Sequence, residues 1–123
     1  VLRRGKPTVH VKYGEAQALL AGDALQALAF EFLTPQDGST EVAVQSAQVS
    51  LLARASGYQG MAGGQAIDLA SVGHALGEDE LRQMHRLKTG ALLQGSVMLG
   101  AACAEPTDAA RLAWWEKAYG LTP

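Results

Sequence analysis

A stretch near the start of the chain, residues 13–33 (YGEAQALLAGDALQALAFEFL), has apolar side chains on almost every side of a helical wheel. Ala, Leu and Phe cover well over half of that wheel, which is typical of a helix that other helices surround. The chain is long enough for such a bundle, because 123 residues with 48% hydrophobic content can bury a core as one domain. We therefore expect a multi-helix fold.

Helical spacing continues after the loop at residues 34–40, where Pro, Gly, Asp and Ser cluster. From Glu41 apolar residues recur every three or four positions, which predicts a helix running on to about Leu69. Four glycines oppose this helix: Gly57, Gly60, Gly63 and Gly64. Each costs a helix up to about 1 kcal/mol relative to Ala. We expect the close approach of a neighbouring helix or of a ligand to compensate.

The second half of the chain predicts two further helices. A loop at Ser71–Leu81 contains three consecutive acidic residues, 78–80, which suit the positive end of a helix reaching about Cys103. Pro106 then begins a last helix, which contains Trp114 and Trp115 and reaches Tyr119. Because no stretch alternates with the period of a strand, we predict an all-α fold of about four core helices.

Composition limits the partners. The formal net charge is only −2, so no overall basic field would attract nucleic acid. The most apolar run, Leu92–Ala104, is too short to span a membrane and predicts a buried core helix. The single cysteine, Cys103, allows no internal disulfide or cysteine-based metal site, and it fits a reducing, cytoplasmic location.

The first cluster of candidate site residues is basic. It consists of Arg3, Arg4, Lys6, His10 and Lys12. Gly5 and Pro7 interrupt it, which predicts a fixed turn rather than a helix face. Adjacent guanidinium groups offer forked donors that match diphosphate oxygens. A solvated basic loop is the plainer alternative.

Two more clusters interrupt apolar sequence. In GMAGGQAIDL, a helix would place Gln65 and Asp68 on one face, either as a polar pair at a close helix crossing or as a binding wall. In MHRLKTGALLQG, Lys88 and Thr89 stand at the start of the apolar run. A buried ammonium needs an anion because its desolvation is costly, unless the flexible stem of Lys88 carries it to water.

Other catalytic patterns are missing. The histidines have no metal-ligand spacing, and the sequence contains no Gly-x-Ser-x-Gly and no phosphate-binding loop. No Gly-x-Gly-x-x-Gly follows a strand pattern. The hydrolase and dinucleotide-binding interpretations are therefore excluded.

In their order and spacing, the three clusters resemble the short-chain trans-polyprenyl diphosphate synthases, specifically bacterial farnesyl diphosphate synthases. LRRGKPTVHVKYGEAQALLAGDALQALAFEFL is similar to the segment after that family's first aspartate-rich motif. GMAGGQAIDL resembles its central Gly-Gly-Gln-x-x-Asp-Leu helix, and MHRLKTGALL its Lys-Thr-Gly helix. The likeness covers Leu2 to about Leu121. It implies an isoprenoid-synthase-type helical bundle, with residues 1–123 as a partial polyprenyl synthetase domain.

The implied reaction condenses an allylic diphosphate, dimethylallyl or geranyl, with isopentenyl diphosphate to make farnesyl diphosphate. Cations around the departing pyrophosphate would stabilise the transition state, and apolar helix walls would keep water from the carbocation. By motif match, Arg3 would contact the allylic diphosphate and Arg4 the isopentenyl diphosphate. Lys88 and Thr89 would be catalytic, at the allylic diphosphate and the carbocation.

The same resemblance places Gln65 and Asp68 in the allylic pocket. Asp68 would lie near the family's magnesium ions, with Lys88 as a candidate ion-pair partner. Lys6, His10, Lys12 and Asp23 also stand in family-like sequence, and we expect structural roles for them.

The sequence departs from the family pattern at both ends. Two Asp-Asp-x-x-Asp motifs flank this region in the family, and neither occurs in these 123 residues. We expect no metal site within this chain, and no activity from the 123 residues alone. The complete enzyme would use Mg²⁺ and form a homodimer. The alternatives are a geranyl or geranylgeranyl diphosphate synthase, or a non-catalytic helical interaction subunit, against which the intact LRRGKPT and LKTG segments speak.

Overall fold

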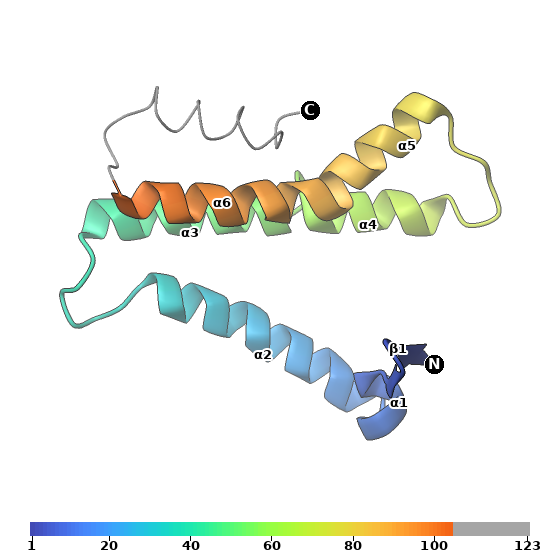
Figure 1. Cartoon of the computed structure of the whole chain (residues 1–123), viewed down its shortest axis with the longest axis horizontal. Coiled ribbons are helices and arrows are strands. Elements are labelled where there is room, and N and C mark those ends of the chain that lie inside the picture. Colours follow the sequence, from blue (N-terminus) through green and yellow to red (C-terminus); the bar gives the residue numbers. More distant parts are fainter. Residues whose placement is uncertain (105–123) are drawn as a thin grey trace. The chain divides into compact units, whose positions relative to one another are not determined.

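The computed structural model describes residues 1–104, so the helix expected after Pro106 lies outside the described part of the chain. The chain divides into two compact units, one formed by Val1–Asp37 and one that begins at Gly38. Figure 1 shows the elements of each unit. Helices dominate both, as predicted.

The first unit begins with a small hairpin. Strands β1 (Leu2–Arg3) and β2 (Lys6–Pro7) pair antiparallel, with Arg3 opposite Lys6. The prediction of a purely helical chain missed this hairpin because two-residue strands are too short to show alternation. Helix α1 (Val9–Tyr13) follows and carries His10 and Lys12. The prediction that these two residues belong to a turn was therefore wrong.

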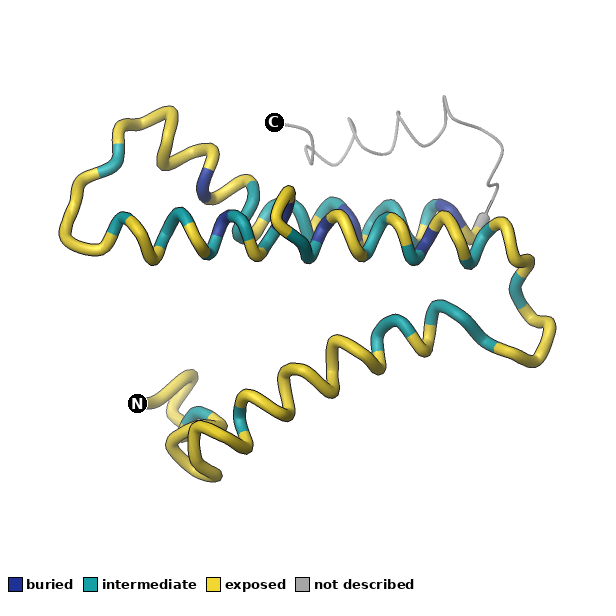
Figure 2. The backbone as a smooth tube through the Cα atoms, turned by 180° about the vertical axis from the view of Figure 1, so that it is seen from behind, coloured by how far each residue is buried: buried dark blue, intermediate teal, exposed yellow. Residues whose placement is uncertain are grey.

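Helix α2 (Glu15–Leu33) packs against α1 within the first unit. Gly14 joins the two helices with φ +96°, a left-handed conformation that glycine adopts without strain and that lets the chain change direction. None of the residues of α2 is buried, and Phe32 is 75% exposed. Exposed residues follow most of its length in Figure 2. The described residues thus leave uncovered the apolar surface that we expected other helices to surround.

The second unit is a hairpin of two long helical runs. The first run contains α3 (Val42–Ser56) and α4 (Met61–Ala70). The second contains α5 (Glu78–His85), the π-helical turn η1 (Arg86–Gly90) and α6 (Ala91–Ala104). It returns in the opposite direction, so that α6 packs on α3 and η1 packs on α4 (Figure 1). None of the helices within residues 1–104 is long and apolar enough to cross a bilayer.

The single helix expected from Glu41 to Leu69 is interrupted at residues 57–60, between α3 and α4. The break follows from the glycines. A Cβ on Gly60 would lie 2.6 Å from the carbonyl oxygen of Arg54, because the chain folds back against the end of α3. Only glycine permits that approach. The acidic start of α5 was predicted correctly, and the Glu80 carboxylate accepts a hydrogen bond from the N–H of Gly77 at 3.2 Å.

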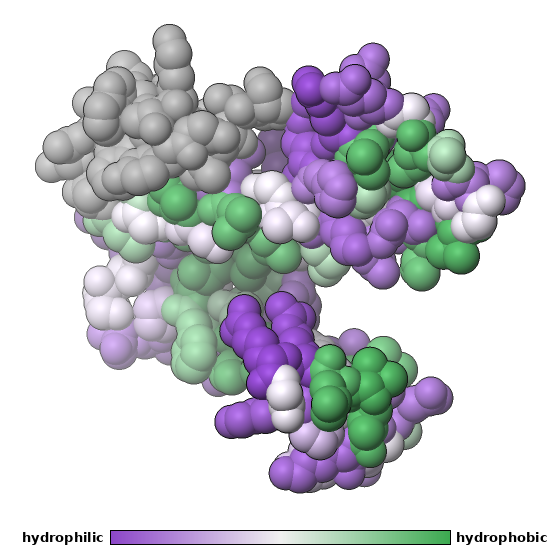
Figure 3. Space-filling view, turned by 45° about the vertical axis from the view of Figure 1, so that its right-hand side comes forward, coloured by the Kyte–Doolittle hydropathy of each residue, from purple (hydrophilic) through white to green (hydrophobic). Residues whose placement is uncertain are grey.

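Small residues bring α3 and α6 together. A Cβ built on Gly95 would lie 3.1 Å from the Cβ of Ala55, and both residues are buried. The expectation that the run Leu92–Ala104 is a buried helix was only partly correct, since Leu93 is 58% exposed. Hydrophobic side chains also reach the surface beside hydrophilic ones in Figure 3.

Gln48 is the buried polar residue of the described core, with 5% of its surface exposed. Its Nε2 donates to the carbonyl oxygen of Leu99 at 3.3 Å and to Cys103 Sγ at 2.9 Å. It therefore fastens α3 to the last turns of α6. Sequence reasoning missed it, because a Gln on a helix usually faces solvent.

We expect Gln48→Met to change the free energy of unfolding by less than about 1 kcal/mol, since Met fills the same volume and leaves no strong donor unpaired. Gln48→Ala should cost about 2 kcal/mol through the cavity that it opens. Chemical denaturation of the full-length protein measures both. Equal losses in the two variants would mean that the hydrogen bonds, rather than the filled volume, hold α3 to α6.

Candidate functional site

The central feature of the candidate site is an ion pair between two helical elements. Lys88 Nζ on η1 donates to Asp68 Oδ2 on α4 at 2.5 Å. The Lys88 and Asp68 side chains are 37% and 39% exposed, respectively, so the ammonium is half-buried rather than fully buried. The expected anion is present, and Asp68 is that anion. A lysine ammonium has three donors, so the bond to Asp68 leaves capacity for a ligand.

Gly64 explains why the two side chains meet. It is buried, and a Cβ at this position would lie 2.6 Å from Lys88 Cα and 2.8 Å from the carbonyl carbon of Leu87. The backbone of η1 therefore lies directly on α4. The prediction that a neighbouring helix compensates for the glycines is confirmed at this position.

The lysine lies within a π-helical turn. In η1, Arg86–Gly90, hydrogen bonds span five residues instead of four, which widens the turn and inserts one residue into the helical register. Lys88 is half-buried against α4, and the adjacent Thr89 is exposed. Such turns occur frequently at functional sites. The only sequence signal for it was Gly90, which weakens an α-helix after Thr89.

Gln65 stands three positions before Asp68 on α4, so the two share a face of the helix, as the spacing predicted. Gln65 is half-buried. Within residues 1–104, no hydrogen bond joins it to Asp68 or Lys88. The structure thus brings together two of the predicted site residues, Asp68 and Lys88, with Gln65 and Thr89 adjacent along their helices.

The predicted diphosphate ligands Arg3 and Arg4 belong to the hairpin of the first unit, and both are exposed. Arg4 has φ +53° and Gly5 has φ +78°, the two left-handed residues of a two-residue hairpin turn. Thr8 closes the hairpin, since its N–H and Oγ1 donate to the carbonyl oxygen of Val1 at 3.1 and 3.3 Å. Neither guanidinium group has an ion-pair partner among residues 1–104.

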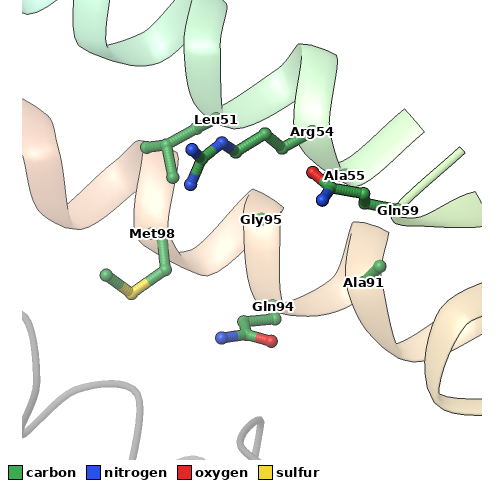
Figure 4. Close-up of a pocket in the computed structure, with 8 residues that line it drawn as sticks. All are labelled: Leu51, Arg54, Ala55, Gln59, Ala91, Gln94, Gly95 and Met98. Atoms are coloured by element: carbon green, nitrogen blue, oxygen red, sulfur yellow. The ribbon is translucent and has the colours of Figure 1, made fainter. Parts of the chain in front are cut away.

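Several hollows lie in the second unit, and two of them border Asp68 or the contact between α3 and α6. One has a volume of about 400 Å³ beside Asp68, and its other lining residues come from the loop after α4 and from α5. They are Ser71, Val72, His74, Ala75, Leu76, Leu81 and Met84. The other, of about 230 Å³, lies between α3 and α6, where Figure 4 shows the Arg54 guanidinium beside Leu51. Gln65, Asp68, Lys88 and Thr89 do not line this second hollow.

A metal site is not formed by the described residues. Within residues 1–104, no group of three or more His, Cys, Asp or Glu side chains is placed to hold a metal ion. The cationic groups of each unit, taken separately, can instead bind an anion. The guanidinium forks of Arg3 and Arg4 in the first unit fit phosphate oxygens, and so does the Lys88 ammonium in the second unit.

Comparison with solved structures agrees with the helical bundle. An FPP/GFPP synthase from Zymomonas mobilis matches with a TM-score of 0.86 and 42% identity, over 98% of this chain and 43% of that one. A geranyltransferase from Helicobacter pylori, complexed with magnesium and isoprenyl diphosphate, matches with a TM-score of 0.86 and 33% identity, over 98% and 39% of the respective chains.

Comparison with curated proteins gives closer sequence relatives. A probable farnesyl diphosphate synthase of Sinorhizobium fredii is 53% identical over 112 residues, 89% of this chain and 32% of that protein. The farnesyl diphosphate synthase of Escherichia coli is 53% identical over 105 residues, 84% of this chain and 35% of that protein. The chain spans about a third of the length of these relatives. The sequence pattern of one family, described as polyprenyl synthetase, matches residues 1–121, and the chain belongs to that family.

Proposed function

We propose that the full-length protein is a trans-prenyltransferase of isoprenoid biosynthesis, which condenses isopentenyl diphosphate with dimethylallyl or geranyl diphosphate to form farnesyl diphosphate. The observation that carries the proposal is the Lys88–Asp68 pair. It fixes one ammonium group at a helix crossing, in a chain that is 53% identical to farnesyl diphosphate synthases.

In the proposed reaction the C–O bond of the allylic diphosphate breaks, and pyrophosphate leaves with the electron pair. The double bond of isopentenyl diphosphate attacks the allylic cation and forms the new C–C bond. The resulting cation then loses a proton to the departing pyrophosphate. Negative charge grows on the leaving group during the first step, so a fixed cation nearby lowers the barrier. Lys88 supplies that cation, Asp68 orients it, and Thr89 is the next residue along η1.

Arg3 and Arg4 are the proposed ligands of the two substrates, Arg3 for the allylic diphosphate and Arg4 for isopentenyl diphosphate. Each guanidinium offers parallel N–H donors to a phosphate group. The closed hairpin fixes the backbone that carries them, which reduces the entropy lost on binding. Gln65 is proposed to line the allylic pocket beside Asp68.

Magnesium, a homodimer and a cytoplasmic location belong to the same proposal. The geranyltransferase complexed with magnesium and isoprenyl diphosphate supports the metal. Residues 1–104 do not fit a metal site by themselves. We therefore propose that the metal ligands lie outside these residues, and we assign no step of the reaction to the metal.

The first experiment is a product assay. Purified full-length protein is incubated with Mg²⁺, labelled isopentenyl diphosphate and either dimethylallyl or geranyl diphosphate, and the products are separated by chain length. We expect a C15 product. A C10 or C20 product would instead identify a geranyl or geranylgeranyl diphosphate synthase, and no turnover would favour a non-catalytic helical subunit.

We predict that Lys88→Met lowers kcat by about 100-fold or more, because it removes a cation from the leaving group. Its effect on the free energy of unfolding should stay below about 1 kcal/mol, since a half-exposed ion pair contributes little to stability. Steady-state kinetics and chemical denaturation measure the two effects. Arg82→Met is the matched control, because it removes the cation of the Arg82–Glu78 pair, which is 2.6 Å long and exposed. Equal kinetic losses in both variants would contradict the role of Lys88.

Arg3→Lys and Arg4→Lys keep the positive charge but remove the parallel N–H donors of the guanidinium group. We expect Arg3→Lys to raise KM for the allylic substrate, and Arg4→Lys to raise KM for isopentenyl diphosphate, each by about tenfold. The control is Arg86→Lys, the same change at an exposed arginine that donates to Gln83 Oε1 at 2.9 Å. Each KM is measured with the other substrate saturating. If both substitutions raised the same KM, the division of roles would be wrong.

A further inference from the structure

We propose that Gly64 is a positioning residue for prenyl transfer, because it lets α4 fix the backbone of Lys88 while Asp68 fixes the ammonium. The inference rests on the proposed function and adds to it the contacts that fix the position of the catalytic cation. Lysine has a flexible stem of four carbons, so one ion pair does not define where its charge lies. Contacts at both ends of the lysine, backbone and ammonium, do define where the charge lies.

The backbone end is defined by Gly64. Any Cβ at this position would overlap the backbone of Leu87 and Lys88, and backbone atoms have no rotamer by which to move away. The contact falls on η1 itself, the turn whose widened register carries the lysine. A methyl group at position 64 would therefore displace the turn as a unit.

The ammonium end lies on the same helix face. Gly64 and Asp68 are four positions apart on α4, so they stand one turn apart, one above the other. Lys88 consequently touches α4 twice, with its backbone at Gly64 and with Nζ at Asp68. Met84, four positions before Lys88 and on α5, is only 4% exposed. The position of the charge is thus set by one helix face, independently of the loop after α4.

The neighbouring glycine separates positioning from packing. A Cβ on Gly63 would meet the carbonyl group of Tyr58, at the connection between α3 and α4, and not η1. Gly63→Ala therefore causes a similar steric conflict on the same helix without touching Lys88. Within residues 1–104, no atom lies within 4 Å of the Cβ position of Gly100 on α6, so Gly100→Ala gives a neutral baseline.

A kinetic cycle in the full-length protein tests the proposal. We expect Gly64→Ala to lower kcat by about 10- to 100-fold, because a displaced cation loses most of its effect on the transition state. In a Lys88→Met background the same substitution should cost less than about threefold, since the group through which it acts is gone. Gly63→Ala should cost the same factor in both backgrounds. If the losses from Gly64→Ala and Lys88→Met simply multiply, Gly64 has a packing role only and the proposal is wrong.

A second measurement does not depend on activity. Acetic anhydride labels lysines at rates that peptide mass spectrometry resolves, and an ammonium held by a carboxylate reacts slowly. We expect Lys88 to be labelled several-fold faster in Gly64→Ala than in the wild type, and as fast as in Asp68→Asn. Lys6 and Lys12, which lie in the first unit, are internal references. An unchanged rate at Lys88 would overturn the proposal, even if the wild type showed no prenyl transfer and the proposed function failed.

If Gly64→Ala does not fold, the ammonium end is tested by Asp68→Ala. Asp68→Ala leaves the backbone contact in place, and its loss of kcat should vanish in the Lys88→Met background. Multiplied losses would show that Asp68 does not act through Lys88. The proposal that contacts at both ends position Lys88 would then be rejected.

Discussion

The backbone contact between α4 and η1 is the constraint on which the rest of the second unit depends. Gly64 allows it, and a side chain of any size would push the two helical runs apart at the level of Lys88. The hairpin of helices uses the same device elsewhere, at Gly95 against Ala55, so small residues set its spacing along the length. Glycines that weaken each helix singly are thus what allows the pair to pack.

In this arrangement the groups that stabilise the fold differ from the charged groups that we propose to bind the substrate. The Lys88–Asp68 pair is half-exposed, and pairs of that kind contribute little to the free energy of unfolding. Its role in the proposed function is geometric, because the pair holds an ammonium with unused donors at one place. The buried Gln48, by contrast, joins α3 to α6 with two hydrogen bonds and carries no charge. The described core is therefore held by close packing and one amide, while the charged groups remain available for a ligand.

Much of this could be predicted from the sequence, and the failures have physical reasons. The spacing of Gln65 and Asp68 and the acidic start of α5 follow from helical periodicity and the helix dipole. The break after Ser56 was missed, because apolar spacing continues through it and only the glycines oppose the pattern. The π-helical turn was missed for a related reason: one inserted residue leaves the composition of a helix unchanged. The first unit does not bury the apolar residues of α2. That other helices surround α2 therefore stays a prediction.

The backbone of the hairpin turn at Arg4 is strained, and this strain bears on the role of the arginine side chain. Two-residue turns of this kind favour Asn-Gly, because both residues take left-handed backbone angles. Here the first of the two positions is occupied by Arg4, with φ +53°. A residue other than glycine in that region costs about 1 kcal/mol or more. The closing hydrogen bonds from Thr8 compensate for the strain but do not require an arginine at the turn. What the arginine adds is a forked cation at the exposed turn of the hairpin, beside a second one at Arg3. A position that prefers Asn or Gly for its backbone and carries Arg agrees with the proposed role of Arg4 as a ligand of one diphosphate substrate, beside Arg3 as the ligand of the other.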